Sequence, residues 1–179
     1  KDASANKGGV TSSSMEVLAS LCLNDEEFDR MMRVKAVDEI HPFYSKYIEC
    51  VYAQIEKNAE LEFEAIWREC RKTEMPKSKY SDELSLAITK LDQELQFTTP
   101  LFYNLSLRRL VLTEAIPTLL IETVGGLDRI LERVPESYLR AMFGSWLASR
   151  FIYAYGTNAS QFAFFEFMTR YYPSGVNSN

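Results

Sequence analysis

A glycine- and hydroxyl-rich segment near the start of the chain holds the residue types best suited to bind an anion. Residues 6–16 read Asn-Lys-Gly-Gly-Val-Thr-Ser-Ser-Ser-Met-Glu. Two glycines before a helix let the backbone approach a ligand closely, and the free amides at a helix start attract an anion. The hydroxyl groups of Thr11, Ser12, Ser13 and Ser14 add donors suited to a carboxylate or a phosphate. A capped loop that binds no ligand gives the same pattern, because such caps are common.

The sequence predicts a loop followed by a helix as the elements that position these groups. Residues 1–11 are polar and contain glycine, which is typical of a loop. Ser13 and Glu16 have the spacing of a capping box, in which the serine hydroxyl and the glutamate carboxylate each accept from an amide at the helix start. We therefore expect a helix from about Ser12 through Leu21.

The rest of the chain has the pattern of amphipathic helices. A second helix is predicted from Asn24 to just before His41-Pro42, since a proline restricts the residue that precedes it. From Pro42, apolar residues recur at intervals of three and four as far as Cys70, which predicts one long helix over about 43–70. Further helices are expected from Ser81 to about Leu95, over 101–124 with a break near Pro117, from Pro135 to about Tyr155, and around 162–168.

The composition agrees with an all-α fold of one domain. The chain has 179 residues, of which 46% are hydrophobic and 25% charged, as in an ordinary globular protein. It contains only 7 glycines, so few tight turns are available, and we find no internal repeat and no convincing strand beyond the first residues. We expect residues 12–172 to form the helical domain and residues 173–179 to be a disordered tail.

Charge and cysteine usage exclude several classes of function. The net charge of −5 argues against sequence-independent binding to nucleic acid or to an anionic membrane, since both need clustered cations. No apolar run approaches a membrane span. The three cysteines have no paired spacing, which favours reduced thiols in an intracellular protein. His41 is the only histidine, so we expect a cap or surface role for it and no metal site.

The chain resembles two parts of a known enzyme family. Residues 6–16 resemble the end of the nucleotide-binding domain in glutamate dehydrogenases, where an Asn-x-Gly-Gly-Val segment leads into a helix that begins with serines. The remainder resembles the C-terminal helical region of the large NAD-specific class found in fungi and other lower eukaryotes, in residues 61–69, 84–88, 134–141 and 147–151. The resemblance implies that residues 1–11 end a Rossmann-like nucleotide-binding domain and that the helical region follows it. It also implies that the chain, which opens without a methionine, was cut from inside a longer protein.

The resemblance also implies roles for individual residues. Asn6 would lie near the nicotinamide ribose and the amino-acid carboxylate, Val10 would line the substrate pocket, and Ser13 would donate to the side-chain carboxylate of glutamate. The role of Ser13 is physically reasonable, because a buried carboxylate needs charge-assisted donors. Lys7 stands where the small hexameric enzymes usually have alanine, and we expect it to face solvent.

The activity that the resemblance implies is the oxidative deamination of L-glutamate to 2-oxoglutarate and ammonia, with NAD as cofactor. The sequence has no G-x-G-x-x-G turn, so the pyrophosphate site, the catalytic lysine and the catalytic aspartate would lie upstream, and the chain alone would be inactive. The whole protein would be a homo-oligomer in the cytoplasm or the mitochondrial matrix. Two alternatives remain open: a helical interaction or oligomerisation module, and a dehydrogenase for an apolar amino acid. The Ser13 hydroxyl argues against the second, since it would be costly to bury unpaired in an apolar pocket.

Overall fold

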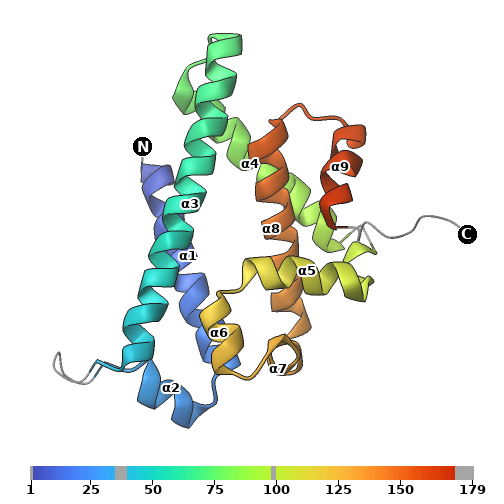
Figure 1. The fold of residues 1–179 in the computed structure, drawn as a ribbon. Helices are drawn as coiled ribbons and strands as arrows, with labels where there is room; N and C mark the ends of the chain where they lie inside the picture. The colour runs from blue at the N-terminus through green and yellow to red at the C-terminus, as the bar shows by residue number, and fades with distance from the viewer. Residues whose placement is uncertain (1, 35–39, 98–99, 172–179) are drawn as a thin grey trace, which may run out of the picture. The chain divides into compact units, whose positions relative to one another are not determined.

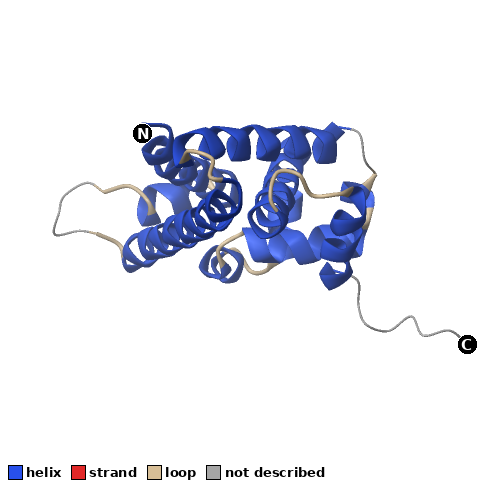
Figure 2. Ribbon diagram, turned by 90° about the horizontal axis from the view of Figure 1, so that it is seen from above, coloured by secondary structure: helices blue, strands red, loops and turns tan. Residues whose placement is uncertain are grey.

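Helices joined by short loops make up the described part of this computed structural model, which covers residues 2–34, 40–97 and 100–171, with side chains from Lys7 onward (Figure 1). None of the described residues forms a β-strand (Figure 2). Two short 3-10 turns accompany the α-helices. In chain order the elements are α1 (Asp2–Cys22), α2 (Asp25–Met31), α3 (Pro42–Thr73), α4 (Lys77–Phe97), η2 (Leu101–Tyr103), α5 (Leu105–Ala115), α6 (Thr118–Thr123), α7 (Leu127–Arg133), α8 (Glu136–Tyr155), α9 (Gln161–Met168) and η3 (Thr169–Tyr171). The predicted all-α class is confirmed.

The helices divide into two compact units. The first contains residues 1–60 and 116–139, and the second contains residues 61–115 and 140–179. Residues of α3 and of α8 therefore belong to both units. None of the helices in the described ranges is long and apolar enough to form a membrane span.

Most helix ends lie where local signals predict them. Pro42 is the first residue of α3, which is the longest described helix, and His41 Nδ1 accepts from the Phe43 amide at 3.1 Å. Pro117 separates α5 from α6, as expected for a residue that cannot donate a helical hydrogen bond. Gly156 ends α8 with a φ of 85°, a backbone conformation that favours glycine.

Two helices have ends that differ from the prediction. The capping box at Asn24 is present, with Asn24 Oδ1 accepting from the Glu27 amide at 2.8 Å, but α2 ends at Met31, well before His41-Pro42. The intervening residues 35–39 lie outside the described part. Helix α4 begins one turn before Ser81, because the Pro76 carbonyl already accepts from the amides of the next turn.

The predicted loop over residues 1–11 is wrong for the residues that the structure describes, because α1 runs continuously from Asp2 to Cys22. Packing explains the difference. Helices α1 and α3 lie side by side in the first unit (Figure 1), and a Cβ placed on Gly8 would lie 3.6 Å from Ile55 Cγ2. Contacts with α3 outweigh the helix cost of glycine, which is about 1 kcal/mol per residue. The predicted disordered tail, residues 173–179, lies outside the described residues.

In the second unit, α8 passes close to α4 at a glycine. A Cβ placed on Gly144 would lie 3.1 Å from the Asp92 carbonyl oxygen and 2.5 Å from its carboxylate oxygen Oδ1. Only a residue without a side chain fits at this crossing unless the neighbours move. Around it, the fully buried side chains include Leu84, Phe102, Phe143 and Leu147.

Candidate functional site

Two of the three residues predicted to contact substrate share one exposed face of α1. Val10 is 58% exposed, and Val17, two turns further along, is 45% exposed. Ser13 lies between them at the helical spacing of three and four residues, and it is also exposed. The opposite face of α1 is buried against the first unit through Leu18 and Cys22. Asn6 belongs to the same helix, one turn before Val10, but its side chain lies outside the described residues.

The sequence predicted that Ser13 caps a helix. This prediction is wrong, because α1 begins at Asp2 and Ser13 lies inside it. Its hydroxyl instead donates to the Gly9 carbonyl at 3.0 Å, and the Thr11 hydroxyl donates to the Lys7 carbonyl in the same way. Such bonds to the preceding turn are the usual choice of hydroxyl side chains inside a helix. A hydroxyl has one hydrogen to donate, so a carboxylate at Ser13 would have to replace the Gly9 carbonyl as its acceptor.

Lys7, which we expected to face solvent, has intermediate exposure, so its side chain is partly covered and partly open to solvent. It lies on the first described turns of α1, beside Gly8. Its place is therefore at the margin of the packed face rather than on the exposed face of Val10 and Ser13.

Three side chains from other helices hold the second half of α1 by its carbonyl oxygens. Tyr47 Oη of α3 donates to the Met15 carbonyl at 2.7 Å, and Tyr138 Oη of α8 donates to the Ser14 carbonyl at 2.6 Å. Arg133 Nη1 of α7 donates to the Cys22 carbonyl at 2.6 Å, at the negative end of the helix dipole. These contacts place α1 firmly within the first unit.

Burial keeps the ionisable groups behind α1 neutral. It raises the pKa of Tyr47 and of Tyr138, and the neighbouring Cys22 thiol raises both further, so each phenol remains a hydrogen-bond donor at neutral pH. Burial also raises the pKa of the Cys22 thiol to about 12, although the Arg133 charge acts in the opposite direction. Cys22 is therefore a packing residue with little thiolate character, and like Cys50 and Cys70 it forms no disulfide.

Neither clustered metal-ligating side chains nor an open hollow on α2 coincides with the predicted contacts of α1. No group of three or more His, Cys, Asp or Glu side chains among the described residues is placed to hold a metal ion. An open hollow on α2 is lined by Asp25, Glu26, Asp29 and Arg30. None of these residues lies on α1, which carries the predicted contacts.

Comparisons with known proteins agree with the resemblance seen in the sequence. The family model described as Glutamate/Leucine/Phenylalanine/Valine dehydrogenase matches residues 1–73. The chain is 56% identical over 170 residues to the NAD-specific glutamate dehydrogenase of Neurospora crassa, which covers 95% of the chain and 16% of that protein. It is 55% identical to glutamate dehydrogenase 2 of Dictyostelium discoideum and 44% identical to the NAD-specific glutamate dehydrogenase of Saccharomyces cerevisiae, in each case over 94% of the chain and 16% of the relative.

The chain is similar to one segment of these glutamate dehydrogenases. It spans about a sixth of the length of these relatives. No solved structure matches it. The family-model match ends with α3, so it includes the candidate face of α1 and the helix that packs against it. The similarity to the glutamate dehydrogenases themselves continues through nearly the whole chain and therefore includes the second unit.

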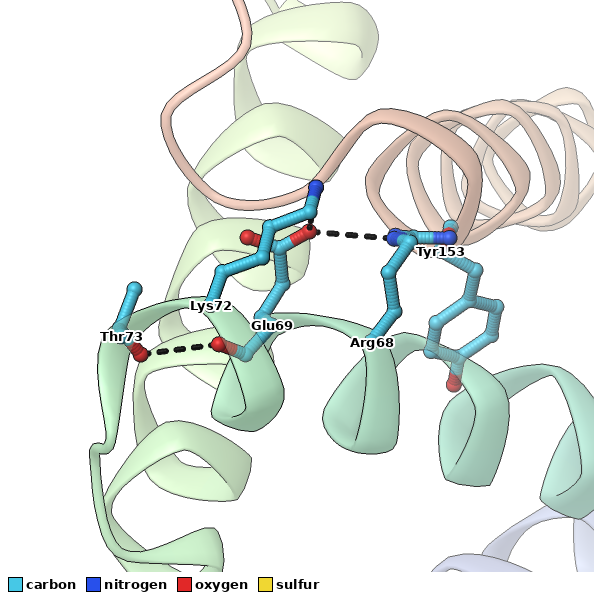
Figure 3. Close-up of polar contacts among 5 residues, drawn as sticks. All are labelled: Arg68, Glu69, Lys72, Thr73 and Tyr153. Atoms are coloured by element: carbon cyan, nitrogen blue, oxygen red, sulfur yellow. Dashed lines mark hydrogen bonds and ion pairs between the residues drawn. The ribbon is translucent and has the colours of Figure 1, made fainter.

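The second unit contains a polar cluster at the end of α8 (Figure 3). Arg68 Nη2 donates to the Tyr153 carbonyl at 2.8 Å, while its Nε donates to Glu69 Oε1 at 3.1 Å. Lys72 Nζ lies 3.3 Å from the same carboxylate oxygen. Partial burial acts to raise the pKa of Glu69, but the hydrogen bonds from Arg68 and Lys72 outweigh it and lower the pKa. The cluster supports a helix end rather than a reacting group.

Two arginines of α8, Arg140 and Arg150, lie against aromatic rings in the second unit. Arg140 donates to the Gln96 carbonyl at 3.2 Å and to Tyr103 Oη at 2.8 Å, and its guanidinium lies 4.7 Å from the centre of the Phe102 ring. Arg150 lies 4.0 Å above the ring of Trp146. Arg140 thus links α8 to α4 and η2, whereas Arg150 lies over a ring of its own helix.

Proposed function

We propose that the chain is part of an enzyme that oxidatively deaminates L-glutamate to 2-oxoglutarate and ammonia with NAD, and that α1 forms one wall of its glutamate pocket. The observation that supports this best is that Val10 and Ser13 share an exposed face within the segment that the dehydrogenase family model matches. The names of the relatives favour glutamate over an apolar amino acid as the substrate. They also favour NAD as the cofactor.

In this proposal the exposed face of α1 recognises the substrate side chain. The Ser13 hydroxyl leaves the Gly9 carbonyl and donates to the side-chain carboxylate, while Val10 packs against the methylene groups of glutamate. Asn6 lies near the amino-acid carboxylate and the nicotinamide ribose. Residues 1–11 would then be the end of the nucleotide-binding domain. The remaining dinucleotide contacts and the groups that transfer protons come from upstream, since the chain has no G-x-G-x-x-G turn.

The same resemblance supports a homo-oligomeric whole protein in the cytoplasm or the mitochondrial matrix. Within this assembly, the second unit is proposed to act as helical scaffold. Its half-buried arginines and their aromatic neighbours are suited to such a role.

One prediction tests whether this chain binds NAD without the rest of the enzyme. The isolated chain is expected to show no dehydrogenase activity and no measurable heat of NAD binding, because it lacks the phosphate-binding turn. Calorimetric titration of the purified chain with NAD measures this, and full-length enzyme serves as the positive control. A micromolar dissociation constant for the isolated chain would show that the cofactor site has been misplaced. A full-length enzyme that prefers leucine to glutamate would contradict the proposed substrate.

A further inference from the structure

Two tyrosine hydroxyls bond to consecutive carbonyls in the middle of α1. Tyr138 Oη donates to the Ser14 carbonyl at 2.6 Å, and Tyr47 Oη donates to the Met15 carbonyl at 2.7 Å. The two tyrosines come from different helices, α8 and α3, and all of these residues belong to the first unit. The bonds therefore attach two separate elements to the turn of α1 that begins directly after Ser13.

These bonds restrain the position of α1 without disturbing its own hydrogen bonds. A carbonyl oxygen has two lone pairs, so Ser14 and Met15 can accept from a tyrosine and from an amide of their own helix. Tyr47 is also almost fully buried, and its ring stacks on Phe43 with 5.5 Å between ring centres, so its hydroxyl is held by packing. Donors from two directions fix both the rotation of α1 about its axis and its position along that axis.

The turn of α1 around Gly8 and Gly9 packs less closely on its neighbours than the turn held by the two tyrosines. A Cβ placed on Gly9 would meet no atom within 4 Å, and Gly8 would make only an ordinary contact with Ile55. Ser13 lies between these two turns. The Ser13 hydroxyl itself donates to the Gly9 carbonyl, while the contacts at Ser14 and Met15 hold the adjoining backbone of α1 that carries the Ser13 side chain.

We propose that Tyr138 and Tyr47 are positioning residues for the recognition of glutamate. They do not touch the substrate. They hold α1 so that the Ser13 hydroxyl meets the side-chain carboxylate, and this inference rests on the role proposed for Ser13. Tyr138 is the more informative of the two, because it brings the start of α8, far along the chain, into the control of substrate recognition.

The test uses Tyr138→Phe in the full-length enzyme, because this change removes the hydroxyl and keeps the ring. We expect kcat/KM for glutamate to fall about three- to tenfold, the effect of losing one neutral hydrogen bond that orients a binding group. The KM for NAD should not change. The rate with L-2-aminopentanoate, which lacks the side-chain carboxylate, should not change either. Tyr52→Phe is the control. Tyr52 belongs to the first unit, on the same helix α3 as Tyr47, but its side chain is 62% exposed.

A double-mutant cycle separates this inference from the proposed function. If Tyr138 acts through Ser13, adding Tyr138→Phe to Ser13→Ala should cause no further loss of kcat/KM for glutamate. Additive losses would overturn the positioning role, and so would an equal loss for glutamate and L-2-aminopentanoate, which indicates general destabilisation. The positioning role is also overturned if Ser13→Ala lowers kcat/KM for glutamate as expected but Tyr138→Phe leaves it unchanged. That result leaves the proposed function intact. An enzyme that is insensitive to Ser13→Ala contradicts the proposed function itself. Tyr47→Phe repeats the cycle from α3 if Tyr138→Phe lowers the melting temperature.

Discussion

Replacing Ser13 by alanine in the full-length enzyme should lower kcat/KM for glutamate. The loss should be smaller than that of one charge-assisted hydrogen bond, because the Ser13 hydroxyl is already bonded within α1. A new charge-assisted hydrogen bond to glutamate is worth roughly 1.5–3 kcal/mol. The Ser13 hydroxyl, however, already donates to the Gly9 carbonyl at 3.0 Å, and giving up that neutral bond costs roughly 0.5–1.5 kcal/mol. Taken at the midpoints of the two ranges, the difference of about 1.25 kcal/mol corresponds to an about eightfold lower kcat/KM for glutamate.

The same variant should have the opposite effect on stability from the one that a helix cap would give. Losing a cap costs about 1 kcal/mol, but Ser13 lies inside α1, where alanine is favoured over serine by up to about 0.5 kcal/mol. Ser13→Ala should therefore leave the melting temperature unchanged or raise it slightly. Ser12→Ala is the control, since Ser12 is also exposed on α1 but has no proposed contact with substrate.

The assay is steady-state kinetics with glutamate and NAD varied in turn, accompanied by a thermal melt. The KM for NAD should not change, because the Ser13 hydroxyl is not proposed to contact the dinucleotide. Glutamate kinetics equal to those of the wild type would refute the role of Ser13. A lower melting temperature would show that the hydroxyl stabilises α1 in a way that its bond to Gly9 does not explain.

Two further predictions concern the second unit. Gly144→Ala should lower the free energy of unfolding by about 1 kcal/mol or more in denaturant titrations, because the clash with Asp92 exceeds the gain in helix propensity; Gly9→Ala, with open space around it, should instead be neutral or stabilising. The lowered pKa of Glu69 means that its contribution to stability is present above the unfolded pKa, about 4.3, and is lost as the pH falls through the folded pKa. Glu69→Gln should therefore lower the free energy of unfolding at pH 7. It should also make that free energy depend less on pH between about 5 and 3. The same pH dependence in the variant and the wild type would refute this.

The sequence predicted helix ends best where a proline or a glycine sets them. Pro42, Pro117 and Gly156 limit helices for reasons that act within one or two residues, so they can be recognised without knowledge of the fold. The start of α1 could not be predicted in this way. Gly8 and Gly9 favour a loop locally, whereas the packing of Gly8 against α3, which follows much later in the chain, favours the helix.

The candidate site was only partly accessible from the sequence. The motif and its resemblance supplied Val10 and Ser13, and their common face follows from helical periodicity once residues 2–11 are known to be helical. The contacts of Tyr47 and Tyr138 leave no local pattern, because their acceptors are backbone carbonyls 32 and 124 residues away. The one available signal was that a tyrosine on a buried helix face needs a hydrogen-bond partner.

The most direct test of the central claim is a structure of the full-length enzyme with 2-oxoglutarate and NADH bound. We expect Ser13 Oγ within hydrogen-bonding distance of the side-chain carboxylate, Val10 against the methylene groups, and Tyr138 Oη still bonded to the Ser14 carbonyl. A ligand whose side-chain carboxylate is held by other residues, with the Ser13 hydroxyl still donating to Gly9, would contradict the claim that α1 recognises the substrate.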